Sequence, residues 1–260
     1  MKLIFFDIDG TIIDDEKKEM SQSTKEAIEQ ARKNGHICVI NSGRTWKMVK
    51  GQVTKFTEFD GYVLGCGTMV TYQGQVLLHE SFSEAFSRRI IEALDRYKID
   101  AVLEGAENNF KDSPQRIHYE KARGFMAGFE GMNFGSFEEA PGHFDKFYAY
   151  VEDPQSIRAF SEEFSQELSV VDREQGFYEI MPKGISKATG IQFLAQKLGI
   201  SMEDTVAVGD SSNDIPMLEC AHTSIAMGNG VKALLEMADY VTTDVTQDGI
   251  RNALKWLGVI

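Results

Sequence analysis

Two aspartates separated by one residue follow an apolar run near the start of the chain. Asp7 and Asp9 belong to Asp7-Ile8-Asp9-Gly10-Thr11, directly after Leu3 to Phe6. Residues two apart on an extended chain project to the same side, so both carboxylates can face one crevice. Two like charges this close are unfavourable unless a cation or a shared proton relieves them. The spacing alone fits a metal-linked catalytic pair and a solvated turn equally well.

A second acidic cluster follows another apolar run. Gly209-Asp210-Ser211-Ser212-Asn213-Asp214 comes after Thr205 to Val208. Its carboxylate and hydroxyl oxygens are the hard ligands that magnesium prefers. A turn of this kind that caps a helix is common. Ligands of open α/β sheets, however, bind beyond the carboxyl ends of the strands. Two acidic clusters that both follow strands therefore favour a metal site over two unrelated turns.

Two further segments have the chemistry of a phosphate site. Ser42-Gly43-Arg44-Thr45 follows the apolar run His36 to Ile40 and precedes a helical stretch, where a hydroxyl and free N–H groups can receive an anion. A simple helix cap is the competing interpretation. Lys187 lies at the start of a predicted helix, against the helix dipole, which hints at a role beyond stability.

The elements that must position these residues alternate between apolar strands and amphipathic helices, which predicts an α/β fold with a parallel sheet. From residue 82 the predicted strands and helices follow the pattern of an α+β module. The alternation of apolar strands and amphipathic helices returns before Lys187. We expect a discontinuous core formed by residues 1–81 and 182–260, with residues 82–181 inserted as a separate domain.

Composition limits the partners. The 260 residues carry 40 acidic and 27 basic side chains, a net charge of −13, which disfavours nucleic acid and anionic membranes. No signal peptide or membrane-spanning run is expected from the sequence. The spacing of Cys38, Cys66 and Cys220 fits neither a zinc site nor a disulfide framework, which favours a reducing, cytoplasmic environment. In so acidic a chain, the repulsion of a phosphate group must be offset locally by a metal ion, a lysine or backbone N–H groups.

Taken in order, the four segments resemble the motifs of haloacid dehalogenase-like phosphatases. Asp7-Ile8-Asp9-Gly10-Thr11, Ser42-Gly43-Arg44, Lys187 and Gly209 to Asp214 carry the likeness. The flanking text is similar to the Cof-type branch, whose large α/β cap (type IIB) is inserted between the second and third motifs. The resemblance implies a Rossmann-like, doubly wound core with such a cap at residues 82–181.

The resemblance also implies roles. Asp7 would be the nucleophile that forms an aspartyl-phosphate, and Asp9 the general acid and base. A small-molecule phosphate ester, a sugar phosphate above all, would be the substrate, and the protein a monomer or small homo-oligomer. The implied phosphate-binding residues are Ser42, Gly43, Arg44, Lys187 and Asn213, and the implied Mg²⁺ site comprises Asp7, Asp9 (through its backbone carbonyl), Asp210, Ser211 and Asp214.

Two alternatives remain open at this point. A phosphomutase or phosphotransferase would use the same aspartyl-phosphate, and a non-catalytic regulator would bind a phosphometabolite on the same fold. Cys66 and Ala188 depart from the branch's usual residues, and Cys66 leaves specificity open. Basic residues of the predicted cap are candidate contacts for the leaving group: Arg116, His118, Lys121, Arg123 and Lys146.

Overall fold

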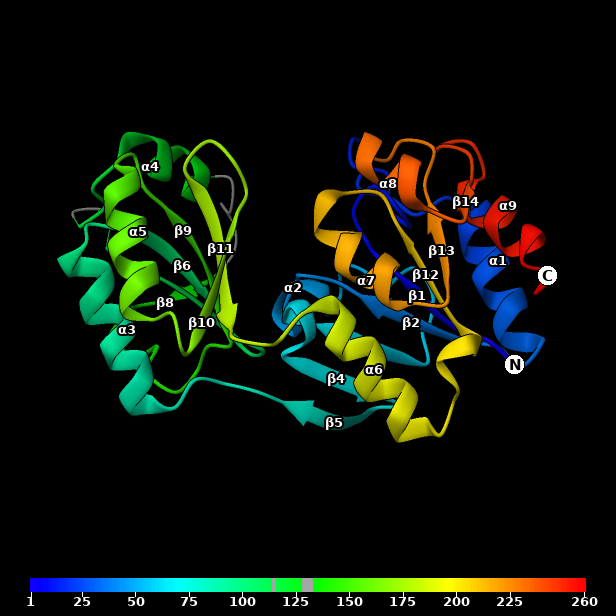
Figure 1. Cartoon of the computed structure of the whole chain (residues 1–260), viewed down its shortest axis with the longest axis horizontal. Helices are drawn as coiled ribbons and strands as arrows, with labels where there is room; N and C mark the ends of the chain where they lie inside the picture. Colours follow the sequence, from blue (N-terminus) through cyan, green and yellow to red (C-terminus); the bar gives the residue numbers. More distant parts are fainter. Residues whose placement is uncertain (114–115, 128–132) are drawn as a thin grey trace. The chain divides into compact units, whose positions relative to one another are not determined.

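The computed structural model describes residues 1–113, 116–127 and 133–260. These residues form two compact units (Figure 1). The core unit comprises Met1–Arg44, Met48–His79 and Ile185–Ile260. The inserted unit comprises Thr45–Lys47 and Glu80–Gly184. The assignment of these units as a catalytic core and a substrate-specificity cap stays a prediction.

The core unit is built on one mixed sheet of eight strands in the described part of the chain. Its order is β14 (Tyr240–Val241), β13 (Thr223–Ala226), β12 (Thr205–Gly209), β1 (Leu3–Phe6), β2 (Ile37–Asn41), β3 (Gly61–Leu64), β4 (Met69–Tyr72) and β5 (Gln75–His79). The six strands from β14 to β3 are parallel. The predicted α/β class is confirmed, with the antiparallel hairpin β4–β5 added at one edge.

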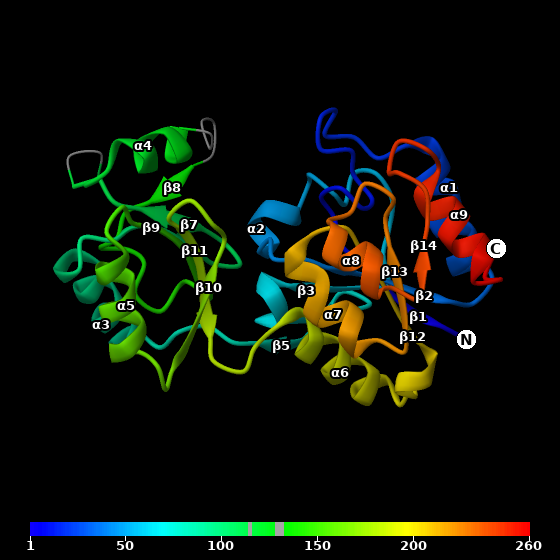
Figure 2. The ribbon, with the colours of Figure 1, turned by 45° about the horizontal axis from the view of Figure 1, so that its top comes forward.

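Helices cover both faces of the core sheet (Figures 1 and 2). Leu3 and Phe5 of β1 pack with Ile191 and Leu194 of α6 (Lys187–Leu198) and with Met217 of α7 (Ile215–Cys220). On the other side lie α1 (Gln22–Lys33) and α9 (Gly249–Trp256), which contact one another. Strands buried on both faces must be apolar throughout, and the four residues of β1 are all buried.

Strand order explains why the predicted site residues converge. β1 lies between β12 and β2, and Phe6 is in register with Val208 and Ile40. The residues that follow these three strands therefore leave the sheet at one edge and at one level. The core unit is completed by α8 (Lys232–Met237), the short turns η2 (Met202–Asp204) and η3 (Ser212–Asp214), and the turn η1 (Gly65–Gly67) after β3. The one-turn helix α2 (Trp46–Val49) follows Arg44 and Thr45.

The inserted unit has its own sheet, in the order β10 (Leu168–Asp172), β11 (Phe177–Pro182), β9 (Lys146–Tyr150), β6 (Asp100–Glu104), β7 (Asn109–Lys111) and β8 (Phe134–Gly135). Helices α3 (Glu84–Arg96) and α5 (Pro154–Glu163) contribute to one aromatic-rich core with this sheet, and α4 (Glu120–Ala127) completes the unit. In the described part of the chain, no helix is both long enough and apolar enough to cross a bilayer.

The turn after β3 sets the start of α6, which carries Lys187. Gly67 has φ +105°, and a Cβ atom there would lie 2.4 Å from the carbonyl oxygen of Ser186. The Ser186 side chain caps α6 by accepting the N–H of Thr189 at 3.2 Å. Only a glycine allows the turn this close to the helix start.

Gly67→Ala should therefore destabilise the protein by about 2–4 kcal/mol, because the new methyl group would displace the backbone at Ser186. Gly74→Ala is the matched control, since Gly74 also has positive φ (+77°) but nothing lies within 4 Å of the new atom. We expect the control to cost about 1 kcal/mol. Urea unfolding of the two variants measures the difference, and equal losses would contradict the predicted clash.

Candidate active site

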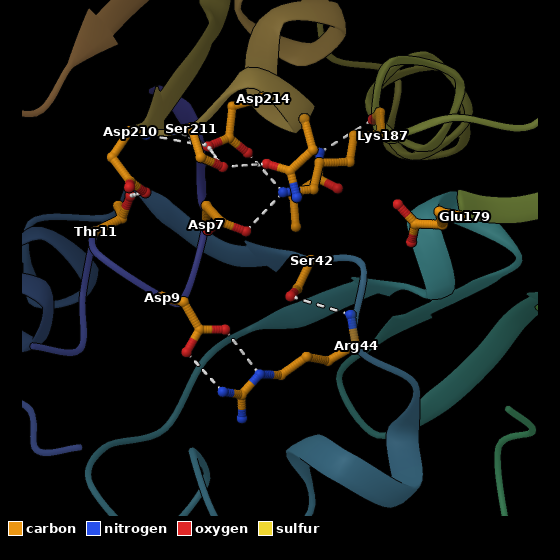
Figure 3. A network of polar contacts seen from close by, with 12 residues as sticks. Asp7, Asp9, Thr11, Ser42, Arg44, Glu179, Lys187, Asp210, Ser211 and Asp214 are labelled. Atoms are coloured by element: carbon orange, nitrogen blue, oxygen red, sulfur yellow. Dashed lines mark hydrogen bonds and ion pairs between the residues drawn. The ribbon is translucent and has the colours of Figure 1, made fainter. Parts of the chain in front are cut away.

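A buried lysine, Lys187, contacts an aspartate from each of the two acidic clusters (Figure 3). The Nζ atom of Lys187 lies 2.6 Å from Asp7 Oδ1 and 2.6 Å from Asp214 Oδ1. All three side chains are buried. Burial alone would lower the pKa of Lys187, but the carboxylates of Asp214 and Asp7 outweigh it and hold the pKa above its usual value. The lysine therefore stays an ammonium ion at neutral pH.

Asp214 also holds the loop that follows β12. Its Oδ2 atom accepts the backbone N–H groups of Asp210 and Ser211, both at 3.0 Å. Both carboxylate oxygens of Asp214 are thus used within the site. This side chain fixes Lys187 and the Asp210 loop in one arrangement, which fits a supporting role around a metal ion.

Asp210 is positioned from the β1 loop. The hydroxyl of Thr11 donates to Asp210 Oδ1 at 2.9 Å. Gly10 has φ +72°, and a Cβ atom there would lie 2.3 Å from Asp210 Oδ2. The amide of Asn229 donates to the Gly10 carbonyl at 2.8 Å and holds this turn. The sequence analysis assigned no role to Thr11, which lies in the first motif, or to Asn229, which lies in the flanking text similar to the Cof-type branch.

The negative charges of Asp7 and Asp210 are not fully compensated by Lys187, and their pKa values show this. Burial, followed by the charge of Asp214, raises the pKa of Asp7 to about 8 despite the opposing effect of Lys187. Burial and Asp214 likewise raise the pKa of Asp210 to about 7. Lys187 alone therefore does not keep Asp7 ionised at neutral pH.

The donor set fits a divalent cation. Asp7, Asp210 and Asp214 each offer a carboxylate oxygen, and these oxygens lie within 4.8 Å of one another. Magnesium is usually held by one or two carboxylates, with waters and substrate oxygens completing its coordination, so this cluster offers enough hard oxygen donors. The Ser211 hydroxyl donates to the Asn213 side-chain oxygen, and Asn213 is half-buried beside the cluster.

The Ser42 loop approaches from β2, next to β1. Ser42 is buried, and its hydroxyl accepts the N–H of Arg44 at 3.3 Å. The guanidinium of Arg44 forms two hydrogen bonds with the carboxylate of Asp9, at 2.8 and 2.6 Å. Figure 3 shows the Asp9 carboxylate turned toward Arg44, whereas Asp7 faces Lys187. The sequence predicted no such pair, because it placed Arg44 only among phosphate-binding residues.

The structure thus brings Lys187, Asp210 and Asp214 together around Asp7. It pairs the Asp9 side chain with Arg44, and its carboxylate is not among the oxygens of the acidic cluster in the described residues. The predicted metal contact of Asp9 was through its backbone carbonyl. The individual roles of these residues, Gly43 and Asn213 included, remain predictions.

The basic residues predicted to contact a leaving group have different surroundings within the inserted unit. Lys146 is fully buried and forms ion pairs with Glu104, at 3.0 Å, and with Glu179. The others are exposed: Arg116, His118, Lys121 and Arg123. A fully paired, buried lysine is held in one position, whereas the exposed side chains are not fixed in this way.

Comparisons with known proteins define the class. A family model of haloacid dehalogenase-like hydrolases matches residues 4–254. Together with the α/β core and the acidic strand ends, this match shows that the chain belongs to the haloacid dehalogenase-like hydrolase family. The resemblance drawn from the motifs is confirmed.

Two relatives from Bacillus subtilis strain 168 match over nearly their full lengths. YkrA is 31% identical over 100% of this chain and 98% of its own length. The 5-amino-6-(5-phospho-D-ribitylamino)uracil phosphatase YcsE is 28% identical over 98% of this chain and 95% of its own. Among solved structures, the HAD subclass IIB sugar phosphatase BT4131 is similar, with a TM-score of 0.83, 25% identity and full coverage of both chains.

Magnesium should stabilise the folded protein more at about pH 8 than at about pH 6, because protons compete with the ion for the carboxylates. Their raised pKa values mean that the metal-free fold loses stability as the pH rises from the ordinary value of 3.8 toward 8. Thermal unfolding with and without Mg²⁺ at the two pH values measures the effect. Asp210→Asn should abolish it, and an unchanged magnesium effect in that variant would contradict the assignment.

Proposed function

We propose that this enzyme is a magnesium-dependent phosphatase that works through an aspartyl-phosphate on Asp7. The observation that carries the proposal is the buried contact of Asp7 Oδ1 with Lys187 Nζ at 2.6 Å, beside the carboxylates of Asp210 and Asp214. An anionic nucleophile approaches an anionic phosphate only where cations offset both charges. This cluster provides one cation and the ligands for another.

The proposed reaction has two halves. In the first, Asp7 attacks phosphorus, the bond to the leaving oxygen breaks, and Asp9 gives its proton to that oxygen. In the second, the Asp9 carboxylate takes a proton from water, whose oxygen attacks the phosphorus of the aspartyl-phosphate. Inorganic phosphate leaves, and Asp7 and Asp9 return to their starting forms.

Residues around Asp7 would hold the transferred phosphoryl group. Lys187 would hold it on one side, and Ser42 and the Gly43 N–H would hold it from the neighbouring loop, with Asn213 beside the acidic cluster. We propose that Asp7, Asp210 and the Asp9 carbonyl hold Mg²⁺, with Asp214 and Ser211 in support. When bound, the ion neutralises charge on the phosphate and on Asp7.

We propose a small phosphorylated metabolite, of the sugar-phosphate or polyol-phosphate class, as the substrate. The named substrate of YcsE carries a phosphoribityl group, and BT4131 is named a sugar phosphatase. The inserted unit, near residues 82–181, would act as the specificity cap. Lys146 is fully buried and paired with Glu104 and Glu179, so the exposed basic residues Arg116, His118, Lys121 and Arg123 are the better candidates for contact with the leaving group.

Asp7→Asn should abolish phosphate release while leaving the fold intact, because the amide is nearly the same size but a poor nucleophile. The test is phosphate release from a panel of sugar and polyol phosphates, with Mg²⁺ and with excess chelator. Wild-type protein should act only with Mg²⁺. Release by Asp7→Asn at an appreciable rate would contradict the covalent mechanism. Isomerised ester without net release would indicate a mutase instead.

A further inference from the structure

The Arg44–Asp9 ion pair has a geometry that an accidental surface contact lacks. Arg44 Nε donates to Asp9 Oδ2 at 2.8 Å, and Arg44 Nη2 donates to Asp9 Oδ1 at 2.6 Å. Two parallel hydrogen bonds from a planar guanidinium fix both the position and the plane of a carboxylate. The remaining nitrogen, Nη1, donates to Gln52 Oε1 at 3.2 Å, so the guanidinium is itself held in place.

The Arg44–Asp9 ion pair is not explained by a contribution to the stability of the fold. The side chains are 23% and 36% exposed, and ion pairs with this much exposure contribute little to the free energy of folding. The pair instead separates two neighbouring carboxylates. Asp7 is held by Lys187 and Asp9 by Arg44, so the side chains diverge (Figure 3). Asp9 thus has a cation that it does not share with Asp7.

We infer that Arg44 is a positioning residue that holds the general acid and base, Asp9, in its working orientation. This inference rests on the proposed phosphatase mechanism and goes beyond it, because the sequence placed Arg44 only in contact with phosphate. As Asp9 gives its proton to the leaving oxygen it becomes a carboxylate, and both of its oxygens are then fixed by Arg44. The same carboxylate would then take a proton from water.

This role predicts a dependence on the leaving group that direct phosphate contact does not. An alkoxide must be protonated as it departs, so an alkyl phosphate needs a well-placed acid. A nitrophenolate leaves without a proton. The ratio kcat/KM reports the steps up to departure of the leaving group, so it isolates this difference from the later hydrolysis of the aspartyl-phosphate.

The experiment compares kcat/KM for the best alkyl phosphate of the panel with that for p-nitrophenyl phosphate. For Arg44→Ala we expect a loss of about 10–100-fold with the alkyl ester, the range that a misplaced catalytic group produces, and a change of less than about 3-fold with the aryl ester. Arg44→Lys keeps the positive charge but cannot form the two parallel hydrogen bonds with Asp9. It should therefore recover only part of the lost kcat/KM for the alkyl ester. Added guanidinium ion should partly rescue Arg44→Ala.

A double-mutant cycle with Asp9→Asn provides the second readout. Because Arg44 acts through Asp9, Arg44→Ala should cost the alkyl ester almost nothing in the Asp9→Asn background. Arg32→Ala is the matched control, since it removes an arginine–aspartate pair of similar exposure, with Asp60, from the same unit. Its effect should be equal for both esters.

Two results would overturn the inference. Equal losses for both esters, persisting in the Asp9→Asn background and accompanied by weaker inhibition by inorganic phosphate, would place Arg44 on the phosphate instead. Inactive wild-type protein, or an Asp7→Asn variant as active as wild type, would overturn the phosphatase mechanism and this inference together. The first result leaves the mechanism standing, so the two failures are distinguishable.

Discussion

The site depends on the ion pairs that the ammonium group of Lys187 forms with two buried aspartates. Its Nζ atom contacts Asp7 after β1 and Asp214 after β12, each at 2.6 Å. The carbonyl oxygen of the same residue accepts the side-chain amide of Asn41, the last residue of β2, at 3.0 Å. One residue therefore ties together the ends of three adjacent central strands. Without it, two buried carboxylates would face one another uncompensated, a large free-energy cost.

One cation is not enough for this group of acids. Lys187 compensates Asp214 and part of Asp7, yet burial and Asp214 still raise the pKa of Asp7 to about 8 and that of Asp210 to about 7. A metal ion at these oxygens would lower both pKa values and leave Asp7 as a carboxylate at neutral pH. The chain's net charge of −13 makes such local compensation necessary for any phosphorylated substrate. The Asp9 carboxylate is instead compensated by Arg44, so it does not depend on Lys187 or on the metal ion for a positive partner.

Local signals in the sequence predicted much of the core. The apolar runs at β1, β2 and β12 are continuous because both faces of these strands are buried, and the chemistry-bearing residues follow them directly. Ser186 and Gly199 bound α6 as a side-chain cap and a left-handed stop. The hairpin β4–β5, which turns at Gln73 and Gly74, adds to the sheet antiparallel to β3, and the predicted parallel sheet did not include this pairing.

Features that depend on distant partners could not be predicted. Strand β6 has only three apolar residues between Asp100 and Glu104, and both acids are buried. Asp100 accepts backbone N–H groups of His118 and Tyr119, and Glu104 pairs with Lys146. The pair of Arg44 with Asp9 likewise joins residues 35 positions apart. A sequence shows that such charges exist but not which partner compensates each of them.

The central claim is that Asp7 becomes phosphorylated during turnover. The direct measurement is acid quenching of the wild-type enzyme with a good substrate and Mg²⁺, followed by peptide mass spectrometry. We expect the mass of one phosphoryl group on the peptide that contains Asp7, and its loss when Mg²⁺ is chelated. Rapid release of phosphate with no phosphorylated Asp7 peptide at any quench time would contradict the account and favour direct attack by water.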